Sequence, residues 1–314
     1  MTLQSDLAEP EADLAPPVQA AQKGYPVTLA PNTSSLVSNG ATARVEKGQA
    51  GRSVLKVIAT PFRAVPRSLS ITLGFVVWIA VIGGWFALTY SGAVKEMFLP
   101  RPESVLSTTI RMAADGSLWE HVFASVQVVL IGFVISSIVA VPLGLMMGTY
   151  RIVQAVLEPL VNFIRYLPVT SFVPLFILWI GIGIEQRVAV IVFGVFFQQL
   201  VMIADSARGV QRDLVNAAYT LGTKRGDTVF HIVFPATLPN VLDVLRVTMG
   251  WAWTYLVVAE LVAARSGLGY ISLKAMRGFQ VDVIFMASAM IGILGLCTDQ
   301  LFRGIRRLVA PWAN

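Results

Sequence analysis

Residues 216–239 read NAAYTLGTKRGDTVFHIVFPATLP and form a polar segment between two long apolar runs. Ala217 and Ala218 are small enough for close contact with another helix, and Gly222 allows a sharp turn. The segment carries no catalytic constellation of its own. A short helix that is followed by a glycine turn and lies outside the membrane has a shape that another protein can bind.

The same segment predicts two short helices. Asn216 or Asp213 can cap the first helix, because both side chains accept hydrogen bonds from free backbone N–H groups. The second helix is expected from about Thr223 to Phe234. Pro235 and Pro239 then return the chain to the bilayer.

The flanking apolar runs indicate a membrane protein. Charged residues make up 13% of the chain and the mean hydropathy is +0.70, whereas soluble proteins carry about 25% charged residues. A spanning helix needs about 20 apolar residues, so we expect an all-α polytopic membrane protein with about six transmembrane helices. Glu185–Arg187 is the expected turn between the third and fourth. The expected spans are Ser70–Tyr90, Val122–Met147, Val169–Ile184, Val188–Ile203, Val241–Ala263 and Val283–Phe302.

The net charge of +6 fits the rule that cytoplasmic loops are rich in Lys and Arg. With both termini inside, more basic residues flank the spans on the inner side than on the outer side. This distribution accounts for the positive net charge, so no nucleic-acid partner is needed to explain it. Cys297 is the single cysteine, so no disulfide forms within one chain, and His121 and His231 lack metal-ligand spacing.

Four regions follow from this pattern. Residues 1–50 are rich in Ala, Pro, Ser and Gly and are expected to be a disordered cytoplasmic tail rather than a signal peptide. Residues 51–69 suit an amphipathic interfacial helix or a simple basic flank of the first span. Residues 70–314 form the transmembrane domain, with a cytoplasmic loop at 205–240.

Two further features concern helix packing. Pro102 with Glu103 opens an external connector helix that ends at Asp115. Gly144 and Gly148 have the spacing that lets helices approach closely, and we expect contact within the chain rather than a dimer seam.

Prolines recur between the second and third spans, at Pro159, Pro168 and Pro174. Broken helix within a membrane is tolerated where it is buried in protein or lines a cavity. The segment RYLPVTSFVP, residues 165–174, is therefore a candidate lining for a transport path. A kinked packing helix is the alternative.

The polar segment closely resembles the cytoplasmic "EAA" loop of ABC importer permeases. The matching residues keep the spacing of Ala217, Ala218, Gly222, Ile232 and Pro235. Asn216 replaces the usual Glu and Phe234 the usual Leu, so Asn216 can still cap a helix but offers no charge to the ATPase. In that family the loop docks into the ATPase subunit, so the implied coupling residues are Asn216, Ala217, Ala218, Gly222, Thr223, Lys224, Arg225, Ile232 and Pro235.

Other segments resemble permeases of the nitrate/sulfonate/taurine/bicarbonate family, among them ILWIGIG (177–183) and AELVAARSGLG (259–269). The resemblance covers about residues 97–312. It implies a type I importer fold in the bacterial inner membrane, working as a homodimer with two ATPase subunits and an external substrate-binding protein. ATP and Mg would reside on the ATPase, since this chain lacks the Gly-rich ATP loop; we expect no enzyme activity and no cofactor.

An anionic cargo in a low-dielectric path needs donors or positive charge. For Gln198 and Gln199 packing competes with a pathway role, and for Trp251 and Trp253 core packing or interface anchoring is the alternative. Glu260 lies within a span, where a charge costs roughly 2.5–3.5 kcal/mol, so we expect a gate or an ion pair, with Arg265 as the nearby partner. The candidate pathway residues are Arg165, Thr170, Ser171, Gln198, Gln199, Arg246, Trp251, Trp253 and Glu260.

Three other functions are open to a protein of this composition. An intramembrane protease needs a nucleophile beside a base at membrane depth, which the sequence lacks. A secondary transporter usually shows inverted repeats and several intramembrane ionisable groups. A permease of another ABC branch, for example for amino acids, is the third. Taurine or another sulfonate, nitrate and bicarbonate all fit as cargo, and ILWIGIG favours sulfonates.

Overall fold

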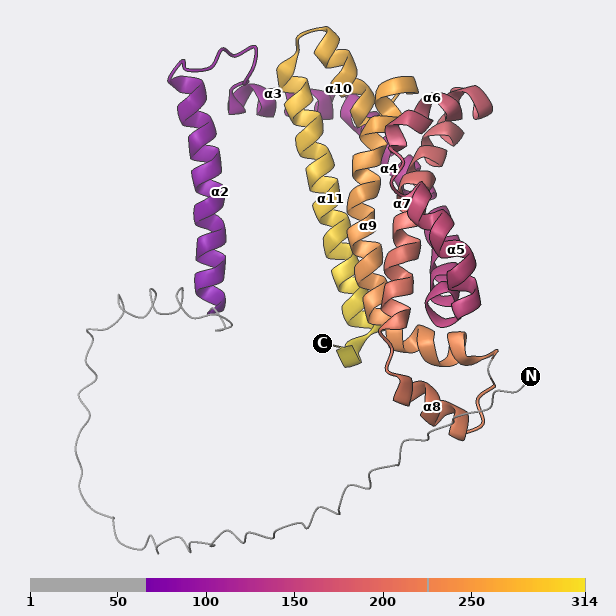
Figure 1. The fold of residues 1–314 in the computed structure, drawn as a ribbon. Helices are drawn as coiled ribbons and strands as arrows, with labels where there is room; N and C mark the ends of the chain where they lie inside the picture. The colour runs from indigo at the N-terminus through magenta and orange to yellow at the C-terminus, as the bar shows by residue number, and fades with distance from the viewer. Residues whose placement is uncertain (1–65, 225, 314) are drawn as a thin grey trace, which may run out of the picture. The chain divides into compact units, whose positions relative to one another are not determined.

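The computed structural model describes residues 66–224 and 226–313, and this part of the chain is built from helices and the turns between them (Figure 1). The proposed tail at 1–50 lies outside the described residues, as does most of the proposed interfacial helix at 51–69. The elements are α2 (Arg67–Tyr90), α3 (Pro102–Ala114), α4 (Ser117–Thr149), α5 (Arg151–Ile164), α6 (Val169–Ile180), α7 (Ile184–Arg208), α8 (Arg212–Thr220), the π-helical η1 (Val229–Val233), α9 (Phe234–Ala263), α10 (Leu268–Arg277), α11 (Val281–Val309) and the 3₁₀ turn η2 (Pro311–Ala313).

Five helices of the described residues are long and apolar enough to cross a membrane: α2, α4, α7, η1 with α9, and α11. The pair α5 and α6 makes a sixth candidate, bent by 95° at its break. The prediction of about six spans is confirmed. The expected third span at Val169–Ile184 is wrong, because α6 alone has 12 residues and needs α5 to reach across.

The turn between α6 and α7 also differs from the prediction. It lies at Gly181–Gly183, where Gly181 has a φ of 94°, a backbone conformation that glycine adopts readily. Glu185–Arg187 belongs to the first turn of α7 instead. An acidic residue there suits the positive end of the helix dipole.

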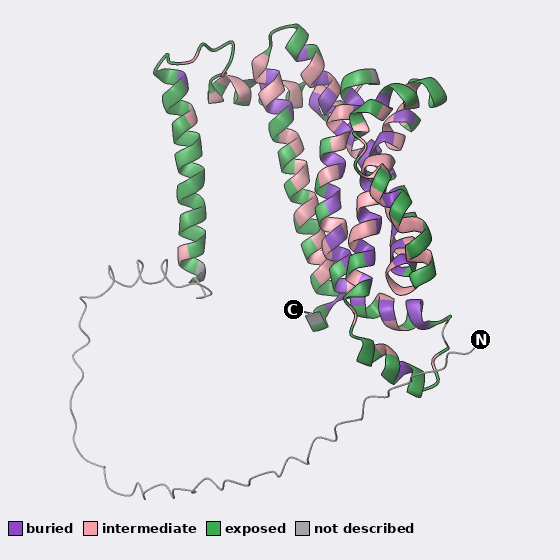
Figure 2. Ribbon diagram, in the orientation of Figure 1, coloured by how far each residue is buried: buried purple, intermediate pink, exposed green. Residues whose placement is uncertain are grey.

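The core forms where α4, α7 and α9 pack together. Figure 2 shows buried residues along these three helices. Glycines on α4 allow the close approach: a Cβ at Gly132 would lie 2.8 Å from Ile191, and one at Gly144 would lie 2.9 Å from Ile203. A Cβ at Gly148 would collide with Ala204 of α7, so the prediction that Gly144 and Gly148 pack within the chain is confirmed.

A polar network crosses this apolar core. Gln199 of α7 is fully buried; it accepts a hydrogen bond from Ser136 at 2.7 Å and donates to Ser137 and Thr248 at 3.0 and 3.1 Å. These bonds join α7 to α4 and α9. Interhelical hydrogen bonds of this kind are a common way to hold membrane helices in register.

The connector helix is confirmed as α3, with Pro102 at its first position and Glu103 in its first turn. By contrast, α2 buries almost none of its surface: Phe75, Trp78 and Ile79 are 64–68% exposed (Figure 2). Trp85 is its anchor, donating to the Pro100 carbonyl at 3.0 Å and stacking on Phe285 of α11.

Candidate functional site

The break between α5 and α6 creates the main candidate site. Pro168, directly before α6, has an extended backbone and no N–H to continue a helix. Tyr166 and Leu167 complete the turn through bonds to the carbonyls of Phe163 and Ile164. The prediction that helix is broken within residues 165–174 is confirmed at its start, and Pro174 is accommodated inside α6.

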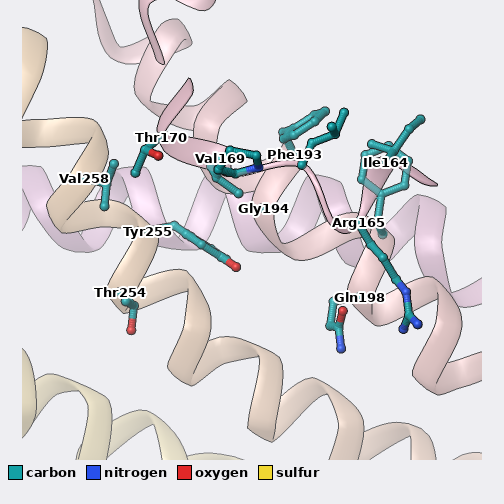
Figure 3. Close-up of a pocket in the computed structure, with 13 residues that line it drawn as sticks. Ile164, Arg165, Val169, Thr170, Phe193, Gly194, Gln198, Thr254, Tyr255 and Val258 are labelled. Carbon is teal, nitrogen blue, oxygen red and sulfur yellow. The ribbon is translucent and has the colours of Figure 1, made fainter. Parts of the chain in front are cut away.

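A pocket of about 330 Å³ opens beside this break (Figure 3). Its α7 wall comes from residues 193–198, near the middle of that 25-residue helix, so the pocket lies about midway along the bundle. It is lined by Ile164, Arg165, Leu167, Pro168, Val169, Thr170, Phe193, Gly194, Phe197, Gln198, Thr254, Tyr255 and Val258. No acidic residue is among these lining residues.

Arg165 brings the positive charge to the pocket. One terminal nitrogen donates to the Tyr166 hydroxyl at 2.8 Å, and the guanidinium lies 4.7 Å from the centre of the Tyr166 ring. Its Nε is buried and has no hydrogen-bond partner in the described part of the chain. Arginine offers five donors in a planar fork, so Arg165 retains donor capacity for a ligand.

Tyr255 of α9 lies directly against Gly194 of α7. A Cβ on Gly194 would lie 2.6 Å from the Tyr255 ring, which is closer than two non-bonded carbon atoms can approach. The glycine therefore makes room for the ring. In Figure 3 the ring extends across the pocket toward Gln198, and the Gln198 amide and the Arg165 guanidinium point the same way.

The structure brings together part of the predicted pathway set. Arg165, Thr170 and Gln198 share the pocket. Trp251 lines an adjoining hollow together with Gln198, Thr254 and Tyr255. The pathway role of these residues stays a prediction.

Other predicted pathway residues lie elsewhere. Gln199 serves the core network described above. Trp253 is buried and donates to Thr298 of α11 at 3.2 Å, which corresponds to the packing alternative. Ser171 is exposed and does not line the pocket.

Arg246 is engaged in ion pairs near the inner ends of α9 and α11. Its guanidinium lies 3.4 Å from Asp299 and 3.9 Å from Asp243. Arg303 and Arg306 pair with the same two carboxylates, at 2.8 and 3.4 Å. The charge of Arg246 is thus shared between two acids rather than presented to the pocket.

Glu260 is buried near the outer end of α9 and does not pair with Arg265, whose side chain is exposed. Its carboxyl oxygens accept hydrogen bonds from the Ser125 hydroxyl at 2.8 Å and from the Gly269 N–H at 2.7 Å. The Leu268 N–H in turn donates to Ser125 at 2.8 Å. Glu260 therefore ties the start of α10 to α4 and α9, and the expected ion pair is replaced by hydrogen bonds.

The coupling loop is a helix and a turn, as predicted, with different boundaries. α8 begins after Gln211, so Asp213 and Asn216 lie inside the helix and neither caps it. Gly222 follows with a φ of 92°, and the Thr223 N–H donates to the Ala218 carbonyl at 3.0 Å. This is the arrangement that terminates many helices at a glycine.

The second helix of the loop is shorter than predicted. Its described part begins around Thr228 rather than Thr223, and η1 runs directly into α9. Pro235 occupies the first turn of α9 and Pro239 lies within it. Because η1 and α9 form one continuous span from Val229, Pro235 lies inside that span, near its inner end, and does not start it. Lys224 and Ile232 belong to the same loop, and the placement of Arg225 lies outside the described residues.

Thr254 and Tyr255 are pocket residues that sequence reasoning missed. With Trp251 and Val258 they recur at the three- and four-residue spacing of one helix face. Gly194, Phe197 and Gln198 follow the same spacing on α7. That shared face was the available signal, but it becomes meaningful only when the two helices are known to be neighbours.

Comparison with known proteins identifies the family. Residues 140–312 match the family described as "Binding-protein-dependent transport system inner membrane component". The chain belongs to this family of ABC importer permeases. A probable ABC transporter permease protein of Brucella melitensis is 38% identical over 231 residues, covering 74% of this chain and 93% of the relative. It follows that the chain is a multi-pass inner-membrane transport component.

Two further relatives are named for the substrates that they transport. The taurine transport system permease protein TauC of Escherichia coli is 28% identical over 252 residues, 79% of this chain and 92% of the relative. A putative aliphatic sulfonates transport permease protein SsuC of Bacillus subtilis is 28% identical over 270 residues, 85% of this chain and 98% of the relative.

A solved structure supports the fold of the permease. A chain of the inward-facing MetNI methionine ABC transporter superposes with a TM-score of 0.58 at 17% identity, covering 63% of this permease and 98% of that chain. The type I importer permease fold predicted from the resemblance is confirmed. Membership in the family implies an ATPase and a substrate-binding protein as partners.

Among the described residues, no cluster of His, Cys, Asp or Glu could hold a metal ion.

Proposed function

We propose that this permease carries a small anion, most specifically a sulfonate such as taurine, across the inner membrane. The observation that supports this proposal is the pocket beside the α5–α6 break. Arg165 supplies a cationic fork with an unpartnered Nε. Gln198, Thr170, Thr254 and Tyr255 add neutral donors, and no carboxylate lines the pocket.

A sulfonate suits these groups. It carries one negative charge spread over three oxygens, each an acceptor, and a planar guanidinium can bind two of them side by side. The pocket volume of about 330 Å³ lies at the lower end of the range for small-molecule sites. The substrates for which TauC and SsuC are named favour a sulfonate, whereas a related permease is named for formylaminopyrimidine. Nitrate and bicarbonate are the alternatives.

The energy for transport would come from two ATPase subunits, each docked on the coupling loop of one copy. α8 ends in the sharp turn at Gly222 and leaves Leu221 88% exposed, as a docking helix requires. A second copy of the permease would supply the facing wall of the path, and alternating access would arise from movement of the two copies. The exposed apolar surface of α2 is available to lipid or to that second copy.

Co-purification from the native membrane tests the assembly. We expect an ATPase and an external binding protein to be recovered with the chain and identified by mass spectrometry. The ligand of that binding protein then names the cargo. Recovery of the chain alone, with ion-gradient-driven uptake in proteoliposomes, would contradict the proposal and favour a secondary transporter.

Arg165→Met tests the pocket within the assembled importer. We expect uptake of the sulfonate to fall at least about tenfold, because a hydrogen bond to a charged group contributes about 1.5–3 kcal/mol. Arg265→Met is the control, since that arginine is exposed at the outer surface. Equal uptake by the two variants would exclude Arg165 from the path.

A further inference from the structure

A second cavity, of about 650 Å³, lies beneath the coupling helix. It is bounded by the ends of α4 and α7, the first turn of α5, most of the length of α8, and η1. Its lining is basic and polar, with no acidic residue among the lining side chains. The polar lining side chains that matter here are Arg151, Gln154, Arg208, Arg212 and Asn216.

The three arginines are not equivalent. Arg208 is neutralised, because it pairs with Asp205 and lies 3.6 Å from Glu158. Arg151 and Arg212 form no ion pair with any described residue. Two uncompensated cations therefore line one cavity.

Two helix N-termini add to the positive potential. Arg151 is the first residue of the 14-residue α5, and Arg212 is the first residue of the nine-residue α8. Neither helix has a side-chain cap; α5 has no acid in its first turn, whereas α8 carries Asp213 there, so the α5 start is the more positive of the two. The free N–H groups and the dipole at a helix start favour an anion.

We propose that this cavity binds a phosphate group, held by Arg151 and Arg212 and by the first turns of α5 and α8. A phosphate accepts several hydrogen bonds at once and matches the arginine fork. The cavity lies where α4 and α7 end on the side that carries the coupling loop, which is the depth of lipid headgroups. The phosphate can therefore come from an anionic lipid of the inner leaflet or from free phosphate in the cytoplasm.

The position of the site suggests what the phosphate does. It touches α8, which contacts the ATPase under the proposed function, and α5, which leads about 21 Å along its axis to Arg165 in the transport pocket. An occupant would brace the coupling helix against the helix that carries the break. The binding itself does not depend on the identity of the cargo.

Binding to the full chain, without an ATPase, tests the proposal. The chain is placed in phosphatidylcholine nanodiscs and titrated with inorganic phosphate, followed by its unfolding temperature. In parallel, native mass spectrometry of chain purified with phosphatidylglycerol counts retained lipid. We expect Arg151→Gln and Arg212→Gln each to weaken binding about tenfold. Arg307→Gln, which removes an inner-side charge outside the cavity, is expected to leave it unchanged.

The outcomes separate the sources. Arginine-dependent retention of phosphatidylglycerol assigns the site to lipid, and arginine-dependent stabilisation by inorganic phosphate alone assigns it to the free ion. Asn216→Asp, an exposed change that places a carboxylate in the cavity, is expected to abolish either effect even if the arginine variants fold poorly. Binding that is insensitive to all three cavity variants overturns the proposal, whereas failed ATPase co-purification would affect only the proposed function.

Discussion

Gly194 and Tyr255 illustrate how single residues shape the pocket beside the α5–α6 break. The ring of Tyr255 occupies the space that a side chain at position 194 would need. Neither residue is charged, and neither is conspicuous in an apolar span. Together they set the width of the pocket between α7 and α9, while Arg165 sets its charge.

Gly194→Ala is expected to displace the Tyr255 ring and to reduce uptake severalfold, since overpacking costs about 1–3 kcal/mol. Gly250→Ala is the matched control on α9, because a Cβ there meets no atom within 4 Å. The measurement is ATP-dependent uptake by the reconstituted importer. In a Tyr255→Ala background the collision is gone, so the Gly194→Ala change should have little further effect; an undiminished effect there would refute the steric explanation.

Glu260 is a residue whose role changes once its neighbours are known. Glu260→Ala leaves the Ser125 hydroxyl and the Gly269 N–H without their acceptor, and each buried unsatisfied group costs about 1–3 kcal/mol. Glu260→Gln keeps one acceptor and can donate to Ser125 with its amide, so we expect a smaller loss. Unfolding of the detergent-purified chain measures both, and equal losses would argue against the hydrogen-bond account.

At the scale of elements, the α4–α7 contact holds the bundle together and the turn after α8 sets the shape of the proposed coupling loop. The first depends on glycines that remove side-chain bulk. The second depends on a glycine that adopts a backbone conformation closed to most residues. Glycine thus allows close helix packing on α4, and after α8 it allows the chain to turn sharply.

Gly148→Ala is expected to push α4 away from α7, because the new Cβ would collide with Ala204 and approach the Ala207 Cβ within 2.6 Å. We expect a loss of about 1–3 kcal/mol in stability. Gly292→Ala on α11, where a Cβ meets nothing within 4 Å, provides the control. Comparable unfolding midpoints for the two variants would show that α4 and α7 can separate without cost.

Gly222→Ala is expected to distort the coupling turn, since a side chain at a φ of 92° is strained and costs about 1 kcal/mol or more. The chain should still fold but should stimulate and retain its ATPase less well. Gly226→Ala has open space and no positive φ, and is expected to behave as the wild type. Normal coupling in Gly222→Ala would mean that the turn is remade when the ATPase docks.

At the scale of the whole molecule, the helices must be threaded through the membrane with the coupling loop inside. Cysteine labelling tests this, starting from a Cys297→Ser background that has no other cysteine. Lys95→Cys lies in an exposed connector expected outside, and Leu221→Cys lies at the exposed tip of the coupling loop. In intact cells a membrane-impermeant maleimide should label the cysteine at position 95 and should not label the cysteine at position 221. The reverse pattern would invert the topology and remove the ATPase from reach.

The sequence by itself determined the class of protein, the approximate number of spans and the position of the helix and glycine turn between two spans. These features are local: hydropathy over about 20 residues, a proline-marked break, and the Ala217–Ala218–Gly222 spacing. Each can be read along the chain because the bilayer and the backbone impose the same requirements wherever the segment lies.

Only the tertiary structure decided which polar residues belong to the pocket. Arg246 and Glu260 are ionisable side chains within a span, yet the first is neutralised by Asp299 and Asp243 and the second is held by hydrogen bonds from Ser125 and Gly269. Tyr255 lines the pocket because α9 packs against α7 at Gly194. Partners so distant in sequence leave no periodic signal in the chain, since they are set by how the helices pack.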